Sequence, residues 1–137
     1  MEYLNIFQKR DPKQEKKVRF KDEFSEDERS AESSKILAEF PDRIPIILEQ
    51  DQNNGNSNSL GVIDKRKYLV PRDLTVGQFI WTIRKRLSPH LSSSQAIYIF
   101  VSGEVPAASS MLSHIYEDYK DRDGFLYITY AGENTFG

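Results

Sequence analysis

Four short apolar segments constrain the fold of this chain more than any other feature. Each is four to seven residues long and rich in β-branched and aromatic side chains, which is the composition of a β-strand. They span residues 43–49, 67–70, 96–101 and 125–130. Residues 96–101 are apolar at every position, which predicts a strand buried on both faces. Pro45 has no amide hydrogen, so one edge of the first strand is expected not to donate to a ladder there.

An amphipathic helix is predicted between the second and third strands, over residues 73–87. Its apolar side chains recur at helical spacing and form one face: Val76, Phe79, Ile80, Ile83 and Leu87. Thr75 and Gln78 have the spacing of a capping pair at the start of this helix. Trp81 points well away from the apolar face, so we expect it near the surface.

Three further helices complete the predicted order of elements. A short helix covers residues 18–24, and a longer one begins at the capping box Ser25-x-x-Glu28 and ends at Pro41. The last covers residues 109–120. The resulting order is helix, helix, strand, strand, helix, strand, helix, strand. It indicates the α+β class, a sheet with helices packed on it.

The side chains that most enzyme chemistry requires are missing or isolated. The 137 residues include no cysteine, which excludes disulfides, thiolate metal sites and a cysteine nucleophile. His90 and His114 have no second histidine at metal-ligand spacing, and basic residues interrupt the acidic run of Asp118, Asp121 and Asp123. We therefore expect no catalytic residue, no metal ion and no cofactor.

Charge and hydropathy indicate a cytosolic protein. The longest apolar runs, residues 44–48 and 96–101, are far shorter than the roughly 20 residues of a membrane span. Residues 1–10 lack the apolar core of a secretory signal. The formal net charge of −2 does not favour a nucleic-acid partner, although residues 8–21 carry an excess of five positive charges.

Residues 1–17 show no sustained periodicity and are predicted to form a mobile extension. They combine basic residues with a small apolar cluster of Tyr3, Leu4, Ile6 and Phe7. This composition suits contact with anionic lipid, or a leader that has no such role.

Several longer motifs occur together in the order of one known family. They are Phe-Pro-Asp-Arg-Ile-Pro at 40–45, Asp-Lys-Arg-Lys-Tyr-Leu-Val-Pro at 64–71, Asp-Leu-Thr-Val-Gly-Gln-Phe at 73–79, Ile-Arg-Lys-Arg at 83–86 and Asp-Gly-Phe-Leu-Tyr-Ile-Thr-Tyr at 123–130. Over residues 20–137 the chain thus resembles the autophagy-related protein 8 family of ubiquitin-like modifiers, which includes GABARAP and the microtubule-associated light chains. The resemblance implies a ubiquitin-like β-grasp fold with a four-stranded mixed sheet, preceded by two short N-terminal helices. It divides the chain into an extension (1–17), a ubiquitin-like domain (18–131) and a flexible conjugation tail (132–137).

By the same resemblance, Gly137 is the residue of lipid conjugation. In this family an activating enzyme adenylates the terminal glycine carboxylate, a conjugating enzyme receives it as a thioester, and an amide forms with phosphatidylethanolamine. Glycine suits this step because it has no Cβ to obstruct a catalytic cleft. A cysteine protease processes and delipidates family members. The implied locations are the cytoplasm and, after lipidation, autophagosome and vacuole or lysosome membranes.

The resemblance also implies a groove beside residues 67–70, which binds aromatic-x-x-aliphatic motifs of cargo receptors by strand addition. The aromatic pocket falls at Glu32, Ile36, Pro45, Lys67, Leu69 and Phe125. The aliphatic pocket falls at Tyr68, Val70, Pro71, Leu74, Phe79 and Thr82. The cations expected to attract acidic residues beside the motif are Arg43, Lys65, Lys67 and Arg86. The competing interpretation is that Ile36, Leu69, Phe79 and Phe125 are simply core residues.

Two departures from the family pattern affect these expectations. Ser25-Glu26 stands where the family commonly has Pro-Phe, and Thr82 stands at a pocket position that is usually aliphatic. The leading hypothesis is a lipid-conjugated modifier of autophagy that is not an enzyme. The alternative is a non-conjugated trafficking or cytoskeletal adaptor that uses the same groove. Gly137 discriminates between them, because the adaptor does not need it.

Overall fold

Helices and strands follow one another along the described part of the chain in the predicted order. The computed structural model describes residues 18–51, 63, 65–87 and 95–132. Its elements are α1 (Phe20–Glu23), α2 (Glu26–Glu39), β1 (Arg43–Gln50), β2 (Lys67–Pro71), α3 (Val76–Leu87), β3 (Ile97–Phe100), α4 (Leu112–Tyr119) and β4 (Leu126–Gly132). The predicted extension 1–17 and residues 133–137, with Gly137, lie outside the described residues. Within those residues no helix is long and apolar enough to cross a membrane.

The strands form one mixed sheet in the order β2-β1-β4-β3. β1 is antiparallel to β2 and parallel to β4, and β3 is antiparallel to β4. Pro45 faces Leu69 of β2, whereas the register between β1 and β4 begins only at Ile46. The residue without an amide hydrogen therefore lies where β1 has a neighbour on one side, as its chemistry requires.

The two predicted capping pairs lie at the starts of α2 and α3, whereas α1 and α4 begin two and three residues later than predicted, at Phe20 and Leu112. In α2 the Ser25 side chain accepts a hydrogen bond from the Glu28 amide at 3.2 Å, and the Glu28 carboxylate accepts one from the Ser25 amide at 2.8 Å. This reciprocal capping box satisfies two amides that the first helical turn cannot. Thr75 and Gln78 make the same exchange at the start of α3, with amide bonds of 2.9 and 3.1 Å. Trp81 is 60% exposed, which confirms its predicted place at the surface.

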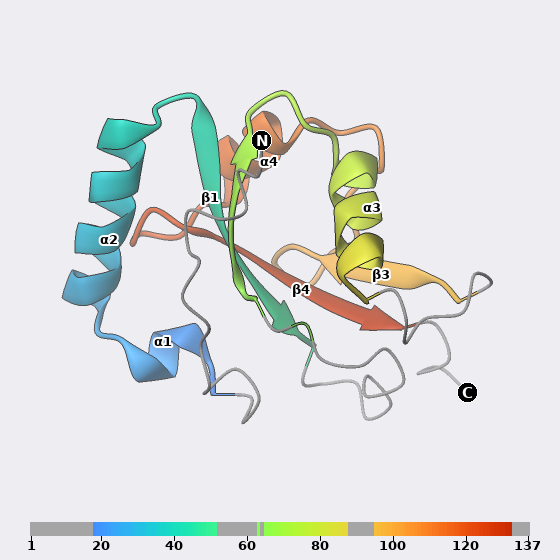
Figure 1. Ribbon diagram of the computed structural model, residues 1–137, viewed down its shortest axis with the longest axis horizontal. Coiled ribbons are helices and arrows are strands. Elements are labelled where there is room, and N and C mark those ends of the chain that lie inside the picture. The colour runs from blue at the N-terminus through green and yellow to red at the C-terminus, as the bar shows by residue number, and fades with distance from the viewer. Residues whose placement is uncertain (1–17, 52–62, 64, 88–94, 133–137) are drawn as a thin grey trace.

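Helices pack on both faces of the sheet and bury two separate apolar clusters. α3 and α4 cover one face with the larger cluster, which includes alternate residues of all the described strands. α1 and α2 lie together on the other face, on the left of Figure 1, over a smaller cluster. The smaller cluster is built from Phe20, Ile36, Ile47, Leu69 and Phe125. Because side chains alternate along a strand, β1 and β2 each supply both clusters.

The prediction that residues 96–101 form a strand buried on both faces is wrong. β3 is an edge strand, and its side chains alternate between buried Ile97 and Ile99 and half-buried Tyr98 and Phe100. α3 covers the isoleucine face. α1 and α2 do not extend over the opposite face of β3, so Tyr98 and Phe100 on that face stay partly exposed.

Ion pairs join the N-terminal helices to the rest of the domain. Three pairs join residues more than ninety positions apart: Lys21–Asp121 at 2.6 Å, Glu26–Arg122 at 2.9 Å and Arg29–Asp123 at 2.6 Å. Arg66, which precedes β2, pairs with Glu23 of α1 at 2.5 Å. Charge complementarity therefore adds to the apolar cluster in fixing α1 and α2 on the sheet.

Candidate functional site

The strand β2 forms one edge of the sheet. It pairs with β1 from Lys67, opposite Ile47, to Pro71, opposite Arg43. In the described part of the chain no strand lies on its other side. An edge strand presents backbone donors and acceptors in the register that a further strand needs. This edge is therefore suited to pairing with an extended peptide.

The side chains of β2 lead to the two apolar clusters in turn. Leu69 belongs to the smaller cluster under α1 and α2, whereas Tyr68 and Val70 belong to the larger cluster with α3. An added strand at this edge would thus have one cluster beside each of its faces. Side chains three positions apart on a bound strand point to opposite faces, so the first and fourth residues of a motif can reach opposite sides of the sheet.

The six residues of the predicted aromatic pocket lie together on one side of this edge. Ile36, Leu69 and Phe125 form part of the same buried cluster, with exposed fractions of 6%, 1% and 0%. Pro45 is the cross-strand partner of Leu69. Lys67 and Glu32 form an ion pair of 3.0 Å between β2 and α2, with about a quarter of each side chain exposed (24% and 30%). Ile36, Leu69 and Phe125 are therefore core residues, as the competing interpretation expected. Being in the core does not prevent them from also lining a pocket.

The predicted aliphatic pocket lies on the other side, between β2 and α3. The Tyr68 and Phe79 rings meet edge to face, with centroids 5.8 Å apart and an interplanar angle of 89°. Val70 is buried beside them, and Leu74 packs against the same cluster while remaining partly exposed. Pro71 ends β2 and is half-buried.

Thr82 is the departure from an aliphatic residue at the border of this pocket. It is half-buried on α3, and its hydroxyl donates to the Gln78 carbonyl at 3.1 Å. The hydroxyl is therefore satisfied within its own helix, as is common for threonine. A bound peptide need not supply a partner for it.

The four predicted cations do not form one group. Lys65 and Lys67 lie at the N-terminal end of β2, whereas Arg43 is opposite Pro71 at the C-terminal end. Four residues of strand, about 13 Å, separate these ends. Arg86 lies in the last turn of α3. One short acidic segment beside a peptide motif cannot contact all four, so these cations suit acidic residues on both sides of a motif.

A buried polar network, which the sequence analysis missed, holds Phe125 of the predicted aromatic pocket in place. The Asp123 carboxylate accepts from Arg29 of α2 at 2.6 Å, from the Tyr127 hydroxyl at 2.6 Å and from the Phe125 amide at 2.9 Å. Ser33 of α2 donates to the Asp123 carbonyl. The network thus holds Phe125 and α2 in one arrangement. Its signal in the sequence is the helical spacing of Arg29, Ser33 and Ile36, which form the buried side of α2.

The tyrosine in this network predicts a loss of stability in alkali. Burial, and then the hydrogen bond to Asp123, raise the pKa of Tyr127 above its ordinary value of 10.0. The unfolded chain releases this proton near pH 10 while the folded chain retains it, so the free energy of unfolding falls as pH rises above 10. Burial raises the pKa of Tyr116 and Tyr130 in the same direction. Urea unfolding at neutral pH and above pH 10 measures the slope, which Tyr127→Phe should make shallower. An unchanged slope in that variant would contradict the role given to Tyr127.

The α+β sheet, its helices and the two-sided edge at β2 define a ubiquitin-like binding module. A family model described as autophagy protein Atg8, ubiquitin like, matches residues 28–137. The chain belongs to this family, whose members are ubiquitin-like modifiers of autophagy and not enzymes. This confirms the fold and the general function expected from the sequence motifs.

Individual relatives agree with this assignment over most of the chain. Autophagy-related protein 8 of Pichia angusta is 55% identical over 118 residues, 86% of this chain and 90% of the relative. The Emericella nidulans protein is 52% identical over 119 residues, 87% of this chain and 96% of the relative. The crystal structure of Trypanosoma brucei ATG8 matches with a TM-score of 0.78 and 39% identity, over 88% of this chain and 98% of that one.

Proposed function

We propose that this modifier is joined through Gly137 to phosphatidylethanolamine and recruits aromatic-x-x-aliphatic peptides to the membrane through the edge of β2. The observation that carries the proposal is that β2 supplies alternate side chains to two separate clusters, one on each side of an unextended sheet edge. The peptide would add a strand beside β2, place its aromatic side chain towards Leu69 and Phe125, and place its aliphatic side chain towards Val70 and Leu74.

The conjugation step rests on the sequence. Gly137 lies outside the described residues, and the family model extends to it. We infer that an activating and a conjugating enzyme of the autophagy lipidation pathway transfer its carboxylate to the lipid amine, and that a cysteine protease reverses the linkage. In this scheme the carboxylate becomes an amide and no residue of this chain takes a catalytic role. The protein would move from the cytoplasm to autophagosome and vacuole or lysosome membranes.

Intact mass measurement tests the conjugation. N-terminally tagged wild-type and Gly137-deleted proteins are recovered from the membrane fraction of starved source cells. We expect a phosphatidylethanolamine adduct on the wild type and none on the deletion variant. A wild-type chain without an adduct that still binds the peptides would contradict conjugation and support the adaptor that uses the groove alone.

Truncation of Leu69 tests the groove separately. Leu69→Ala removes the β2 side chain of the aromatic pocket, and we expect peptide binding to weaken by roughly 1–3 kcal/mol, the usual cost at an interface anchor. Calorimetry with an aromatic-x-x-aliphatic peptide measures the affinity, and circular dichroism checks the fold. The exposed substitution Ser109→Ala is the matched control and should bind normally. Equal affinities of all three proteins would remove Leu69 from the site.

A further inference from the structure

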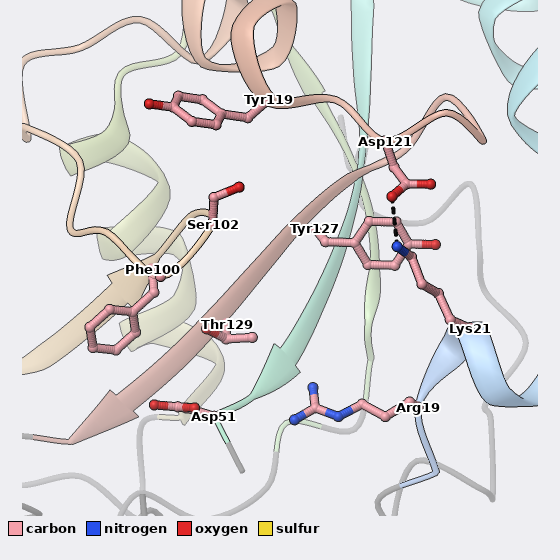
Figure 2. A pocket seen from close by; sticks show the side chains of 10 residues that line it. Arg19, Lys21, Asp51, Phe100, Ser102, Tyr119, Asp121, Tyr127 and Thr129 are labelled. Atoms are coloured by element: carbon pink, nitrogen blue, oxygen red, sulfur yellow. Dashed lines mark hydrogen bonds and ion pairs between the residues drawn. The ribbon is translucent and has the colours of Figure 1, made fainter. Parts of the chain in front are cut away.

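A hollow of about 500 Å³ lies on the same face of the sheet as α1 and α2, towards the opposite edge from β2. Figure 2 shows Phe100, Tyr127 and Thr129 at its base on β3 and β4. Arg19 and Tyr119 lie at its borders. Phe100 is the cross-strand partner of Thr129, which fixes both side chains on this face. The hollow is separate from the peptide edge, because β1 and β4 lie between β2 and β3.

The aromatic face of β3 is apolar but only partly covered in the described residues. Residues 96–101 are apolar at every position, a pattern typical of strands buried on both faces. In the described residues only the face of Ile97 and Ile99 is covered, while Tyr98 and Phe100 on the other face are half-buried. A further apolar segment placed here would remove the exposed part of Tyr98 and Phe100 from water, which is favourable.

The first described residues, which follow residues 1–17 in the chain, lie beside this hollow. The Val18 carbonyl accepts from Arg66 at 3.0 Å, and the Phe20 amide donates to Glu49 at 2.7 Å, so the backbone at this point is fixed. Arg19, between them, borders the hollow in Figure 2. At up to about 3.3 Å per residue, the preceding chain is long enough to return across the whole sheet.

The composition of residues 1–17 complements the hollow. Four large apolar side chains occur within the first seven residues: Tyr3, Leu4, Ile6 and Phe7. From Lys9 to Lys17 there are five cations and two acidic residues. The charged groups that line the hollow are two acidic residues, Asp51 and Asp121, and two basic residues, Arg19 and Lys21, so their charges balance. The match between the segment and the hollow is therefore apolar, between the side chains of residues 3–7 and the aromatic base.

We propose that the hollow binds the N-terminal segment of its own chain, with residues 3–7 packed against Phe100, Tyr127 and Thr129. The covalent link makes this contact favourable even if it is intrinsically weak, because a short tether gives an effective concentration on the order of millimolar. The bound segment covers the aromatic face of β3 and leaves the edge at β2 open. A partner for the β3 face then has to displace the segment first.

Paramagnetic relaxation in the full-length chain tests this contact. The chain has no cysteine, so Asn5→Cys gives a single position for a spin label. We expect the amide signals of Phe100, Ser102 and Thr129 to lose intensity, while that of Trp81 on α3, which packs on the other face of the sheet, keeps it. The losses should be independent of protein concentration, since the contact lies within one molecule.

A matched variant isolates the apolar contact. The same labelled chain with Tyr3, Leu4, Ile6 and Phe7 all changed to serine keeps every charge, and we expect the intensity losses at Phe100 and Thr129 to disappear. Losses that persist in this variant would overturn the proposed packing. Losses that fade on dilution would assign the segment to a second copy, and equal intensities throughout the wild-type chain would show that the hollow does not bind it; either result overturns the proposal.

Discussion

Replacement of Arg66 by alanine is expected to lower the free energy of unfolding by about 3–5 kcal/mol, the usual result of removing one partner from a buried ion pair. The Arg66 side chain is 1% exposed and that of Glu23 is 12% exposed, and they pair at 2.5 Å. The guanidinium also donates to the Val18 carbonyl at 3.0 Å and lies 5.1 Å from the centre of the Phe20 ring. Alanine removes the cation, the carbonyl's donor and the packing on that ring together.

Two further variants separate these causes. Arg66→Met with Glu23→Gln removes both charges and keeps most of the side-chain volume, so it should recover a large part of the stability lost in Arg66→Ala. Arg122→Ala breaks a surface ion pair with Glu26 whose side chains are 85% and 46% exposed, and it should change stability very little. Urea unfolding followed by circular dichroism measures all of them. If Arg66→Ala and Arg122→Ala unfolded at the same urea concentration, burial would not govern the strength of these pairs.

The sequence predicts interactions between residues that are close along this chain, but not those between distant residues. The capping boxes at Ser25 and Thr75 act over three residues, so their residue types and spacing were enough to predict the starts of α2 and α3. Lys21–Asp121 and Arg29–Asp123 join residues about a hundred positions apart. Nothing local marks such partners, because the fold alone brings them together.

The error at β3 has a related cause. An apolar run shows how much of a strand can be buried, but not whether the rest of the chain covers both of its faces. β3 lies at an edge of the sheet, and α3 covers only its isoleucine side. Strand alternation was enough to predict that Leu69 lies on the opposite side of β2 from Tyr68 and Val70. The sequence motifs did not separate Arg43 from Lys65, since the length of β2 that divides them is a property of the folded sheet.

Substitution of Gly124 by alanine should be among the most destabilising single changes in the domain. Gly124 has a φ of +93°, in the left-handed region where a Cβ costs about 1–2 kcal/mol. A Cβ at this position would also lie 3.0 Å from the Ser33 Cβ and still closer to its Oγ. Ser33 is 2% exposed, so it has no solvent space into which to move. Overpacking of this kind costs about 1–3 kcal/mol, and we expect the two effects together to reach roughly 2–5 kcal/mol.

The turn at Gly103 gives a matched control for this prediction. Its φ of +78° is similar, but nothing lies within 4 Å of an added Cβ, so Gly103→Ala should show the backbone cost alone. Ser33→Gly removes the colliding side chain but also its hydrogen bond to the Asp123 carbonyl, so its own cost is measured in a Ser33→Gly single variant. In that background Gly124→Ala should cost less than it does in the wild type, with only the backbone cost remaining. Since Gly124 lies between Asp123 and Phe125, the uncorrected variant should also bind aromatic-x-x-aliphatic peptides more weakly. Equal unfolding free energies for Gly124→Ala and Gly103→Ala would show that contact between α2 and the turn before β4 is looser than these distances indicate.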